Sequence, residues 1–384
     1  MDLELNEEQK RIRDLAREFT EAEIIPHARE NDARERFPRE TIRKMGEAGL
    51  LGGVVPLQYG GAEMDWIADA LLFEEVGRGD SSVRTTISVQ VSLVQQVILR
   101  WGSEEQRRRY LPSLCRGERL GCFAITEPGA GSDAAGIVTR AERCDGGWVL
   151  NGTKAWITNA GVADVAIIFA RTAPGEGSEG TAAFFVETKT PGFTTNEIRG
   201  KLGLRASNTA GIVLKDCRVP EDALLGEVGE GLRIALGALD NGRFGVAAGC
   251  VGIIRGCLEA CTAHARSRRQ FGRPIASFQL VQEMIARMAV DLEASRLLVY
   301  RAALLKNRGE RNTLETSMAK YFASEAAVRA ATDAIQVLGA SGYTNAHPVE
   351  RHLRDAKVAT IYEGTSQIQK LIIGEGILGV KAFV

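Results

Sequence analysis

The stretch Val165-Ala166-Ile167-Ile168-Phe169, in the middle of the 384-residue chain, is a run of branched and aromatic residues typical of a buried β-strand. Asp145-Gly146-Gly147 supplies a good hairpin turn upstream of it. The sequence therefore predicts a β domain over 121–228, with a polar, Gly-rich loop at 173–180. Comparable strand-like runs lie on both sides, at Trp148-Val149-Leu150, Ala183-Phe184-Phe185-Val186 and Gly211-Ile212-Val213-Leu214.

On both sides of this block the apolar residues recur at helical spacing. Before it, the spacing is seen at Ile12, Leu15 and Phe19. After it, the pattern predicts three long helices, at 231–266, 277–306 and 313–338. We expect an α+β fold in three domains: a helical domain at 1–120, the β domain at 121–228 and a second helical domain at 229–384.

Length and charge exclude several classes of protein. A chain of 384 residues exceeds the size at which one hydrophobic core usually suffices, so two or three domains are expected. The formal net charge of -1 gives no long-range basic field, so we expect no nucleic-acid binding. The run Arg107-Arg108-Arg109 lies among acidic residues and is interpreted as a solvated helix face.

Cysteine and histidine usage points to a reducing compartment and to no metal. The seven cysteines include no CxxC pair, and Cys250, Cys257 and Cys261 fall at helical spacing in an apolar run, as small core residues do. His347 and His352 lack both the HExxH spacing and a third ligand. The N-terminus is acidic, and no apolar run reaches membrane-spanning length. We expect a cytoplasmic protein.

Near the end of the chain, Ile361-Tyr362-Glu363-Gly364-Thr365-Ser366-Gln367 places one carboxylate among small and hydroxyl-bearing residues. Glu363 follows an apolar pair, where an isolated charge is costly to bury unless it has a partner or a chemical task. One interpretation is a catalytic base on a ligand-facing turn. The other is a carboxylate stabilised by the dipole of the helix predicted from Ile368 onward.

Two further segments carry ligand-binding features: Thr126-Glu127-Pro128-Gly129-Ala130-Gly131-Ser132-Asp133 and Lys154-Ala155-Trp156-Ile157-Thr158-Asn159. Proline and glycine in the first force an irregular loop whose backbone amides can meet a ligand. The loop is not a GxGxxG fingerprint, which argues against a nicotinamide cofactor. In their order and approximate spacing, these segments and the Glu363 segment resemble the acyl-CoA dehydrogenases, flavoenzymes that remove two hydrogens from Cα and Cβ of an acyl-CoA thioester.

The resemblance implies a helical domain, a small β-barrel, a C-terminal four-helix bundle and FAD as cofactor. It places the flavin against Phe123, Ile125, Thr126, Ser132, Trp156 and Thr158. It also implies contacts to the pyrophosphate and adenylate of a neighbouring subunit's flavin, and hence a homotetramer built as a dimer of dimers. The residues with this status are Arg268, Phe271, Gln336, Thr365 and Gln367.

Taken singly, these residues have simpler interpretations. Trp156 could be a strand aromatic that covers the core. Arg268 could belong to a solvated basic helix end, and Gln336 could be an exposed glutamine.

For the chemistry, the resemblance makes Glu363 the base that removes the α-proton. It also assigns the backbone N–H of Glu363 and a flavin hydroxyl to the thioester oxygen, while the β-hydrogen leaves as hydride. Some members carry the base at the position of Gly242, which has no side chain here. Substrate contacts are implied for Ser132, Asp240, Arg243, Tyr362 and Gly364. An ion pair at i, i+3 explains Asp240 and Arg243 equally well.

Arg84 and Ser88 lie at i, i+4 on a helix predicted to start at Ser81 or Ser82. The segment around them resembles glutaryl-CoA dehydrogenase, in which the matching Arg and Ser bind the distal carboxylate of the acyl chain. The alternative is that Arg84 is a first-turn surface residue, the commoner fate of arginine.

Two features depart from the glutaryl enzymes. Gly77 and Gly79 precede Arg84 where those enzymes carry bulkier or acidic residues, and Ser366-Gln367-Ile368-Gln369 resembles the straight-chain enzymes. Acyl chain length, decarboxylation, and the choice between a CoA and a carrier-protein thioester are therefore left open.

The predicted function is FAD-dependent dehydrogenation of an acyl-CoA to the trans-2-enoyl-CoA in fatty acid or amino acid degradation, with electron-transfer flavoprotein as the acceptor. The substrate is a glutaryl-like dicarboxylyl-CoA or, alternatively, a short or medium straight- or branched-chain acyl-CoA. Competing interpretations are a flavin oxidase or monooxygenase on the same fold and a flavin-free binding protein. Glu363, Trp156, Thr158 and Arg268 in one chain argue against the last, because a scaffold needs no base, ring-stacking residue or phosphate partner.

Overall fold

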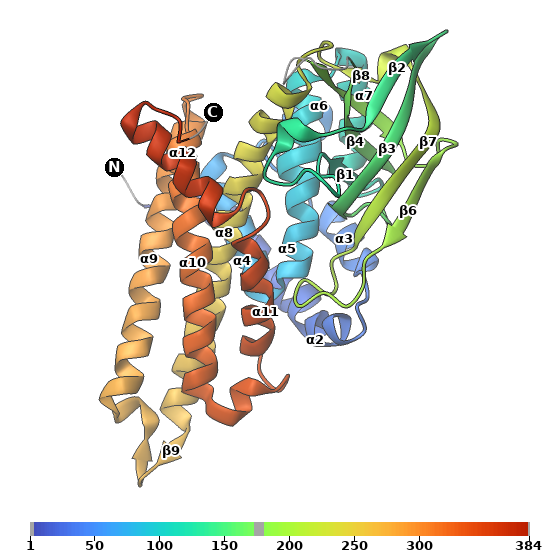
Figure 1. The fold of residues 1–384 in the computed structure, drawn as a ribbon. Coiled ribbons are helices and arrows are strands. Elements are labelled where there is room, and N and C mark those ends of the chain that lie inside the picture. Colours follow the sequence, from blue (N-terminus) through green and yellow to red (C-terminus); the bar gives the residue numbers. More distant parts are fainter. Residues whose placement is uncertain (1–3, 173–179, 383–384) are drawn as a thin grey trace.

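The computed structural model describes residues 4–172 and 180–382. A helical part, a β part and a second helical part follow one another along the chain and pack side by side (Figure 1). The predicted α+β fold class is confirmed. Nearly all of the Gly-rich loop predicted at 173–180 lies outside the described residues.

The N-terminal part is helical up to the first strand. Helices α5 and α6 are continuous, because α5 passes through a π-helical segment, Val89–Val94, into α6. Such π segments are frequent at functional sites. The helices are α1 (Glu7–Phe19), α2 (Ile25–Ala33), α3 (Arg39–Glu47), α4 (Trp66–Gly79), α5 (Ser81–Ser88), α6 (Gln95–Trp101) and α7 (Glu104–Cys115).

The start of α5 confirms one prediction and adds the residue that caps the helix. Asp80 is the N-cap, and its carboxylate accepts a hydrogen bond from the backbone N–H of Ser82 at 2.7 Å. The first helical residue is Ser81, so the prediction that this helix starts at Ser81 or Ser82 is confirmed. The sequence did not identify Asp80 as the cap, although aspartate is as good an N-cap acceptor as serine.

The middle part is an eight-stranded sheet with the order β6-β7-β3-β2-β4-β5-β8 and with β1 beside β4. β2 and β3 pair antiparallel with Cys144 opposite Gly147, so the predicted hairpin turn is confirmed. The strands are β1 (Gly121–Ala124), β2 (Arg140–Cys144), β3 (Gly147–Thr158), β4 (Val165–Arg171), β5 (Thr181–Glu187), β6 (Phe193–Glu197), β7 (Thr209–Pro220) and β8 (Leu224–Leu225).

The C-terminal part contains three long helices whose ends lie within two residues of the predicted ones. A hairpin of β9 (Arg269–Gln270) and β10 (Arg273–Pro274) joins the first two at one end of the bundle (Figure 1). The helices are α8 (Gly231–Ser267), α9 (Gln279–Asn307), α10 (Thr313–Leu338), α11 (Val349–Ala359) and α12 (Ser366–Leu378).

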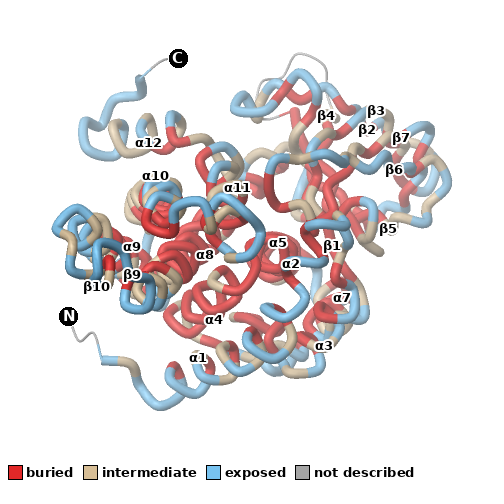
Figure 2. The backbone as a smooth tube through the Cα atoms, turned by 90° about the horizontal axis from the view of Figure 1, so that it is seen from below, coloured by how far each residue is buried: buried red, intermediate tan, exposed pale blue. Residues whose placement is uncertain are grey.

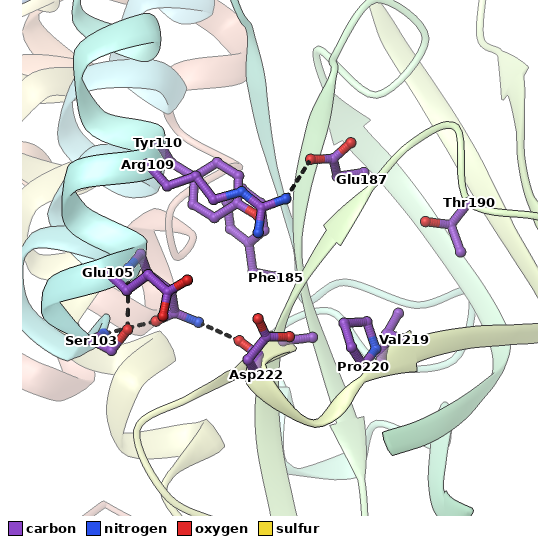
Figure 3. A pocket seen from close by; sticks show the side chains of 12 residues that line it. Ser103, Glu105, Arg109, Tyr110, Phe185, Glu187, Thr190, Val219, Pro220 and Asp222 are labelled. Atoms are coloured by element: carbon purple, nitrogen blue, oxygen red, sulfur yellow. Dashed lines mark hydrogen bonds and ion pairs between the residues drawn. The ribbon is translucent and has the colours of Figure 1, made fainter. Parts of the chain in front are cut away.

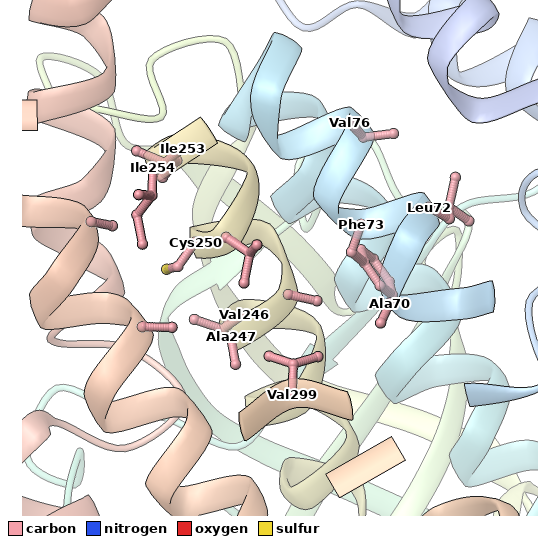
Figure 4. Close-up of a cluster of buried hydrophobic side chains, with 14 of the residues drawn as sticks. Ala70, Leu72, Phe73, Val76, Val246, Ala247, Cys250, Ile253, Ile254 and Val299 are labelled. Atoms are coloured by element: carbon pink, nitrogen blue, oxygen red, sulfur yellow. The ribbon is translucent and has the colours of Figure 1, made fainter. Parts of the chain in front are cut away.

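Helix α8 lies at the centre of the core, between α4 and α10 (Figure 2). Figure 4 shows part of the cluster, with Val246 and Cys250 on α8 and Phe73 on α4. Burial raises the pKa of Cys261 to about 12, and Cys257 is equally buried. The prediction that these cysteines are small core residues is confirmed.

The same helix corrects the expectation about membrane-spanning length. In the described part of the chain, α8 alone is long and apolar enough to cross a membrane, with a hydropathy of 1.5 over its best window. However, 78% of that window is buried inside the protein, as in the core helix of a folded domain. The helix is therefore weak evidence for a membrane span.

Glycines let α8 lie very close to α4. A Cβ atom at Gly252 would lie 2.1 Å from the carbonyl oxygen of Glu74, and one at Gly77 would lie 2.5 Å from the carbonyl oxygen of Gly249. Non-bonded carbon contacts are optimal at about 3.5–4.0 Å. A larger residue would therefore have to push the two backbones apart, and these glycines fix the spacing between the two helical parts.

Gly252→Ala is expected to destabilise the protein by about 1–3 kcal/mol, because the new methyl group has to displace the backbone of α4 or α8. Gly374→Ala in α12 is the matched control, since no atom lies within 4 Å of a Cβ there. It should be neutral or raise stability by about 1 kcal/mol at most, through helix propensity. Denaturant unfolding measures both, and equal stabilities would show that α4 and α8 do not meet tightly at Gly252.

Candidate active site

A cavity of about 120 Å³ lies where α5, the sheet, α8 and the turn before α12 meet. It brings together the predicted base, the predicted carboxylate ligands and five of the predicted flavin contacts. The predicted residues that line it are Arg84, Ser88, Phe123, Ile125, Thr126, Trp156, Thr158, Tyr362 and Glu363.

Glu363 lies on the tight turn between α11 and α12. Its backbone φ is 54° and that of Gly364 is 85°, both in the left-handed region, which glycine adopts readily and glutamate rarely. Helix α12 starts only at Ser366, after Thr365 accepts a capping hydrogen bond from the N–H of Ile368 at 3.2 Å. The interpretation of Glu363 as a carboxylate stabilised by that helix dipole is therefore wrong.

Three side chains hold the carbonyl groups of this turn. Arg243 of α8 donates from Nε to the carbonyl oxygen of Glu363 at 3.2 Å. Lys320 of α10 donates from Nζ to the carbonyl oxygen of Gly364 at 2.7 Å. Gln369 of α12 donates to both oxygens, at 3.1 and 3.0 Å. Each donor comes from a different helix, so the position of the turn depends on the packing of the bundle.

One oxygen of the Glu363 carboxylate is shielded from water. This oxygen, Oε2, is buried without a hydrogen-bond partner among the described residues. Burial raises the pKa of Glu363 to about 7, although the positive charges of Arg243, Lys320 and Arg84 act in the opposite direction. A carboxylate whose pKa lies near neutrality is suited to general-base catalysis.

Arg84 is also buried, with 2% of its surface exposed, so its interpretation as a surface residue is wrong. Its Nη2 donates a hydrogen bond to the hydroxyl of Tyr362. Its Nε and Nη1 are buried and have no partner within residues 4–172 and 180–382. Ser88 lies one helical turn further along α5 and lines the same cavity. A buried guanidinium with free donors, next to a hydroxyl, is suited to binding an anion.

An irregularity in β3 turns Trp156 toward the cavity. The register between β3 and β7 shifts between Lys154 and Ile157, where β3 holds one residue more than its partner. Within this bulge Trp156 has a φ of 60°, and 64% of its surface is exposed. Its interpretation as a core aromatic is therefore wrong. The indole instead forms an open apolar wall of the cavity.

A buried ion pair fixes the loop that follows Thr126. Nζ of Lys154 lies 2.7 Å from Oε1 of Glu127, and the two side chains are 0% and 2% exposed. The carboxylate of Glu127 also accepts hydrogen bonds from the backbone N–H groups of Val138, at 2.7 Å, and Thr139, at 3.0 Å. One carboxylate thus joins the two ends of the loop to the middle of β3.

Other predicted residues lie outside the cavity lining. Ser132 is exposed in the loop after β1, and Gln367 is exposed on the first turn of α12. Asp240 accepts a hydrogen bond from Nη1 of Arg243 at 2.8 Å, so the ion pair at i, i+3 is present. This ion pair orients the arginine that holds the Glu363 turn.

Arg268, Phe271 and Gln336 lie near the β9–β10 hairpin, at the end of the bundle away from the Glu363 turn (Figure 1). All three are exposed, and Phe271 is 92% exposed. Within one chain they are therefore not brought to the cavity. Their contacts with a neighbouring subunit's flavin stay a prediction.

Sequence analysis missed two supporting residues. Lys320 is fully buried among the small residues of α10, and a lysine on such an Ala-rich face was the signal that could have revealed it. Asn159 is fully buried and donates to the carbonyl oxygens of Thr86 and Gly121, both at 3.2 Å, which ties the end of β3 to α5 and β1. Six apolar or hydroxyl lining residues were also missed: Thr85, Val89, Leu93, Ile157, Leu239 and Val246.

A larger hollow of about 370 Å³ between α7 and the sheet has a different character (Figure 3). Tyr110 packs on Phe185, with ring centroids 3.9 Å apart, and Arg109 lies 3.9 Å from Glu187. None of the predicted site residues is among the described residues that line it. Among all residues that the structure describes, no group of three or more His, Cys, Asp or Glu side chains is placed to hold a metal ion.

Three family models match the chain: the N-terminal domain of acyl-CoA dehydrogenase at residues 6–118, the middle domain at 122–217 and the C-terminal domain at 229–378. The chain belongs to the acyl-CoA dehydrogenase family. It is therefore an FAD-dependent oxidoreductase that acts on CH–CH bonds of acyl-CoA thioesters.

Curated relatives cover nearly the whole of this acyl-CoA dehydrogenase. An acyl-CoA dehydrogenase of Bacillus subtilis (strain 168) is 47% identical, over 98% of this chain and 100% of the relative. The mitochondrial short-chain specific acyl-CoA dehydrogenase of Rattus norvegicus is 43% identical, over 98% and 91%. The glutaryl-CoA dehydrogenase of Desulfococcus multivorans is 42% identical, over 99% of both chains.

Solved structures show the same fold. A chain from a structure of the electron transferring flavoprotein of Acidaminococcus fermentans has a TM-score of 0.97 and 42% identity, over 98% of this chain and 100% of that chain. A glutaryl-CoA dehydrogenase in complex with glutaryl-CoA has a TM-score of 0.96 and 42% identity, over 99% and 98%. A Mycobacterium smegmatis glutaryl-CoA dehydrogenase in complex with FADH2 has a TM-score of 0.95 and 37% identity, over 99% and 97%.

The residues of this acyl-CoA dehydrogenase fit the FAD of the family. An isoalloxazine needs a flat apolar wall with hydrogen-bonding groups at its edge. The exposed indole of Trp156 and the half-buried hydroxyls of Thr126 and Thr158 provide both. Gly129 and Gly131 face open space, so a ligand can approach the loop backbone closely.

Lys154→Met is expected to destabilise the protein by about 3–5 kcal/mol, because it leaves the Glu127 carboxylate buried without its charge partner. The loop that Glu127 holds should also bind FAD more weakly. Thermal unfolding and the flavin absorbance of the purified protein measure the two effects. Lys370→Met removes an exposed lysine of α12 and is the control. A Lys154→Met variant as stable and as yellow as the control would contradict the structural role of the pair.

Proposed function

We propose that this acyl-CoA dehydrogenase oxidises a short dicarboxylyl-CoA of the glutaryl type. The observation that carries the proposal is Arg84, which lines the cavity that also holds Glu363. Its Nε and Nη1 are buried and have no partner among the residues that the structure describes. A distal carboxylate on the acyl chain would supply the missing acceptor, and a hydrogen bond to a charged group is worth about 1.5–3 kcal/mol. Ser88 adds a hydroxyl donor on the same face of α5.

The turn at Glu363 supplies what removal of an α-proton requires. The ionised carboxylate of Glu363 accepts the proton from Cα. The backbone N–H of the same residue donates no hydrogen bond among the described residues, so it is free to stabilise the negative charge that develops on the thioester oxygen. Both groups belong to one residue, which the donors from α8, α10 and α12 hold in place.

FAD, when bound, accepts the hydride that leaves Cβ. In one chain the residues that would hold it are Phe123, Ile125, Thr126, Ser132, Trp156 and Thr158. The residues proposed to contact the FAD of a neighbouring chain are Arg268, Phe271, Gln336, Thr365 and Gln367. Because the first three of these lie at the end of the bundle away from the cavity, we propose a homotetramer built as a dimer of dimers.

The proposed electron acceptor is electron-transfer flavoprotein, in keeping with the similarity to the chain from the Acidaminococcus fermentans structure. All seven cysteines are free thiols, and six of them are buried. This usage suits a reducing compartment, and we propose a cytoplasmic location.

The pH dependence of kcat/KM should report Glu363. Its pKa is about 7, and only the ionised form accepts a proton, so kcat/KM should rise with pH through about 7 and then level off. The effect on stability has the opposite sign. Folding raises this pKa from 4.5, so the contribution of the group to stability is present below pH 4.5 and is lost as the pH rises through about 7.

Glu363→Gln keeps the shape of the side chain and removes the base. The variant should bind flavin normally, while its flavin is reduced by substrate about 10²–10⁴-fold more slowly, the range for loss of a general base. Anaerobic stopped-flow absorbance measures the rate. Near-normal reduction would remove Glu363 from the mechanism.

Anaerobic mixing of the yellow protein with glutaryl-CoA and, separately, with butyryl-CoA tests the substrate. The proposal is supported if glutaryl-CoA removes the flavin absorbance at a far lower concentration than butyryl-CoA does. Bleaching with butyryl-CoA alone would overturn it and place the protein with the straight-chain enzymes. The product mass then tells whether glutaconyl-CoA is retained or loses carbon dioxide to give crotonyl-CoA.

Arg84→Gln removes the charge and should lower kcat/KM for glutaryl-CoA by about 10- to 100-fold, which corresponds to the loss of one charged hydrogen bond. The value for butyryl-CoA should change little, because that chain has no distal charge. Steady-state kinetics with both thioesters makes the comparison. An equal loss on both substrates would show that Arg84 supports the site without binding a carboxylate.

A further inference from the structure

Three glycines of α8 lie on one face of the helix, because Gly242, Gly245 and Gly249 are spaced by three and four residues. Each contacts a different side chain of the cavity. Cβ atoms at these positions would meet, in the same order, Oε2 of Glu363 at 2.5 Å, Oγ of Ser88 at 2.9 Å and Cδ of Arg84 at 2.5 Å. Helix α8 therefore has no side chain at the three places where the cavity groups need room.

A side chain at position 249 would press directly on Arg84. A Cβ at Gly249 would also lie 2.6 Å from Nε of Arg84, whereas ordinary contacts need about 3.5–4.0 Å. On the far side of the arginine, Tyr362 accepts the hydrogen bond from Nη2. Gly249 cannot retreat either, since its backbone already lies against Gly77 of α4. A side chain at position 249 therefore has to move the guanidinium.

The guanidinium of Arg84 is also the group whose environment indicates a ligand. Arg84 is 2% exposed, and its Nε and Nη1 have no partner among the described residues. These two donors are therefore unsatisfied in the described part of the chain, and an anionic acyl chain is a ligand that would accept hydrogen bonds from them.

We infer that Gly249 determines the substrate class of this enzyme, because only glycine at this position lets Arg84 present its free donors to a distal carboxylate. The inference rests on the proposed dicarboxylyl-CoA function and names a residue that is not among the described residues lining the cavity. A larger residue at 249 selects against acyl chains with a terminal carboxylate and leaves neutral acyl chains as substrates. Gly249 is thus a positioning residue for Arg84.

The neighbouring glycines have different consequences. A side chain at Gly242 would press on Glu363, the proposed base, and would lower the rate of proton removal from every substrate alike. A side chain at Gly245 meets the hydroxyl groups of Ser88 and Ser92, at 2.9 and 3.1 Å, and leaves the guanidinium of Arg84 in place. Of the three positions, Gly249 is therefore the one that acts on the guanidinium, the charged partner proposed for a distal carboxylate.

The test is a double-mutant cycle on the FAD-loaded protein with Gly249→Ala, Arg84→Ala and the two combined. The measured quantity is the ratio of kcat/KM for glutaryl-CoA to that for butyryl-CoA. Gly249→Ala should lower this ratio by about 10- to 100-fold, the worth of one charged hydrogen bond. In the Arg84→Ala background the same change should have no further effect on the ratio, since the clashing atoms are gone. Gly374→Ala is the control for an alanine gained in a helix.

The outcomes separate the inference from the proposed function. A wild-type enzyme that does not prefer glutaryl-CoA overturns both. A wild-type preference that survives in Gly249→Ala overturns the role of Gly249 alone, as does an equal loss of the ratio in the Arg84→Ala background. If Gly249→Ala loses its flavin and fold but the double variant keeps them, the contact with Arg84 is the cause, as inferred. If the double variant also fails to fold, the packing of α8 is the cause and the inference is wrong.

Discussion

The structure depends on how closely α8 approaches its neighbours. Glycines of α8 let the backbone of α4 come close, at Gly77 and Gly252. Other glycines of α8 leave room for the cavity side chains of α5 and of the Glu363 turn. The same spacing that closes the core therefore sets the size of the cavity. Adding one methyl group at one of these glycines therefore either strains the core or displaces a cavity side chain.

Around this cavity, two charged side chains are only partly satisfied: Glu363 and Arg84. Burial raises the pKa of Glu363, and Nε and Nη1 of Arg84 have no hydrogen-bond partner in the described part of the chain. Such groups are costly to bury and persist at functional sites. Lys320 and Arg243 limit this cost by holding the turn carbonyls and by lowering the pKa of Glu363, which keeps the carboxylate available as a base near neutral pH.

The sequence predicted what depends on local pattern. The apolar run at Val165 and the long helical repeats located the sheet and the bundle, and the Glu363 segment identified the proposed base through family resemblance. What it could not predict depends on long-range packing. The exposure of Trp156 follows from a bulge that only strand register reveals, and the burial of Arg84 follows from the approach of α8. The start of α5 was predicted, but its N-cap was not identified because Asp80, Ser81 and Ser82 are all good caps.

The most direct test of this account is a crystal structure of the FAD-loaded protein with an unreactive glutaryl thioester bound. The account predicts that the distal carboxylate lies within about 2.7–2.9 Å of Nε or Nη1 of Arg84, the length of a charge-assisted hydrogen bond, while Cα faces the carboxylate of Glu363. It also predicts that the backbone of α8 at Gly249 stays in contact with the arginine. A distal carboxylate directed to solvent, with the donors of Arg84 still unpaired, would contradict it.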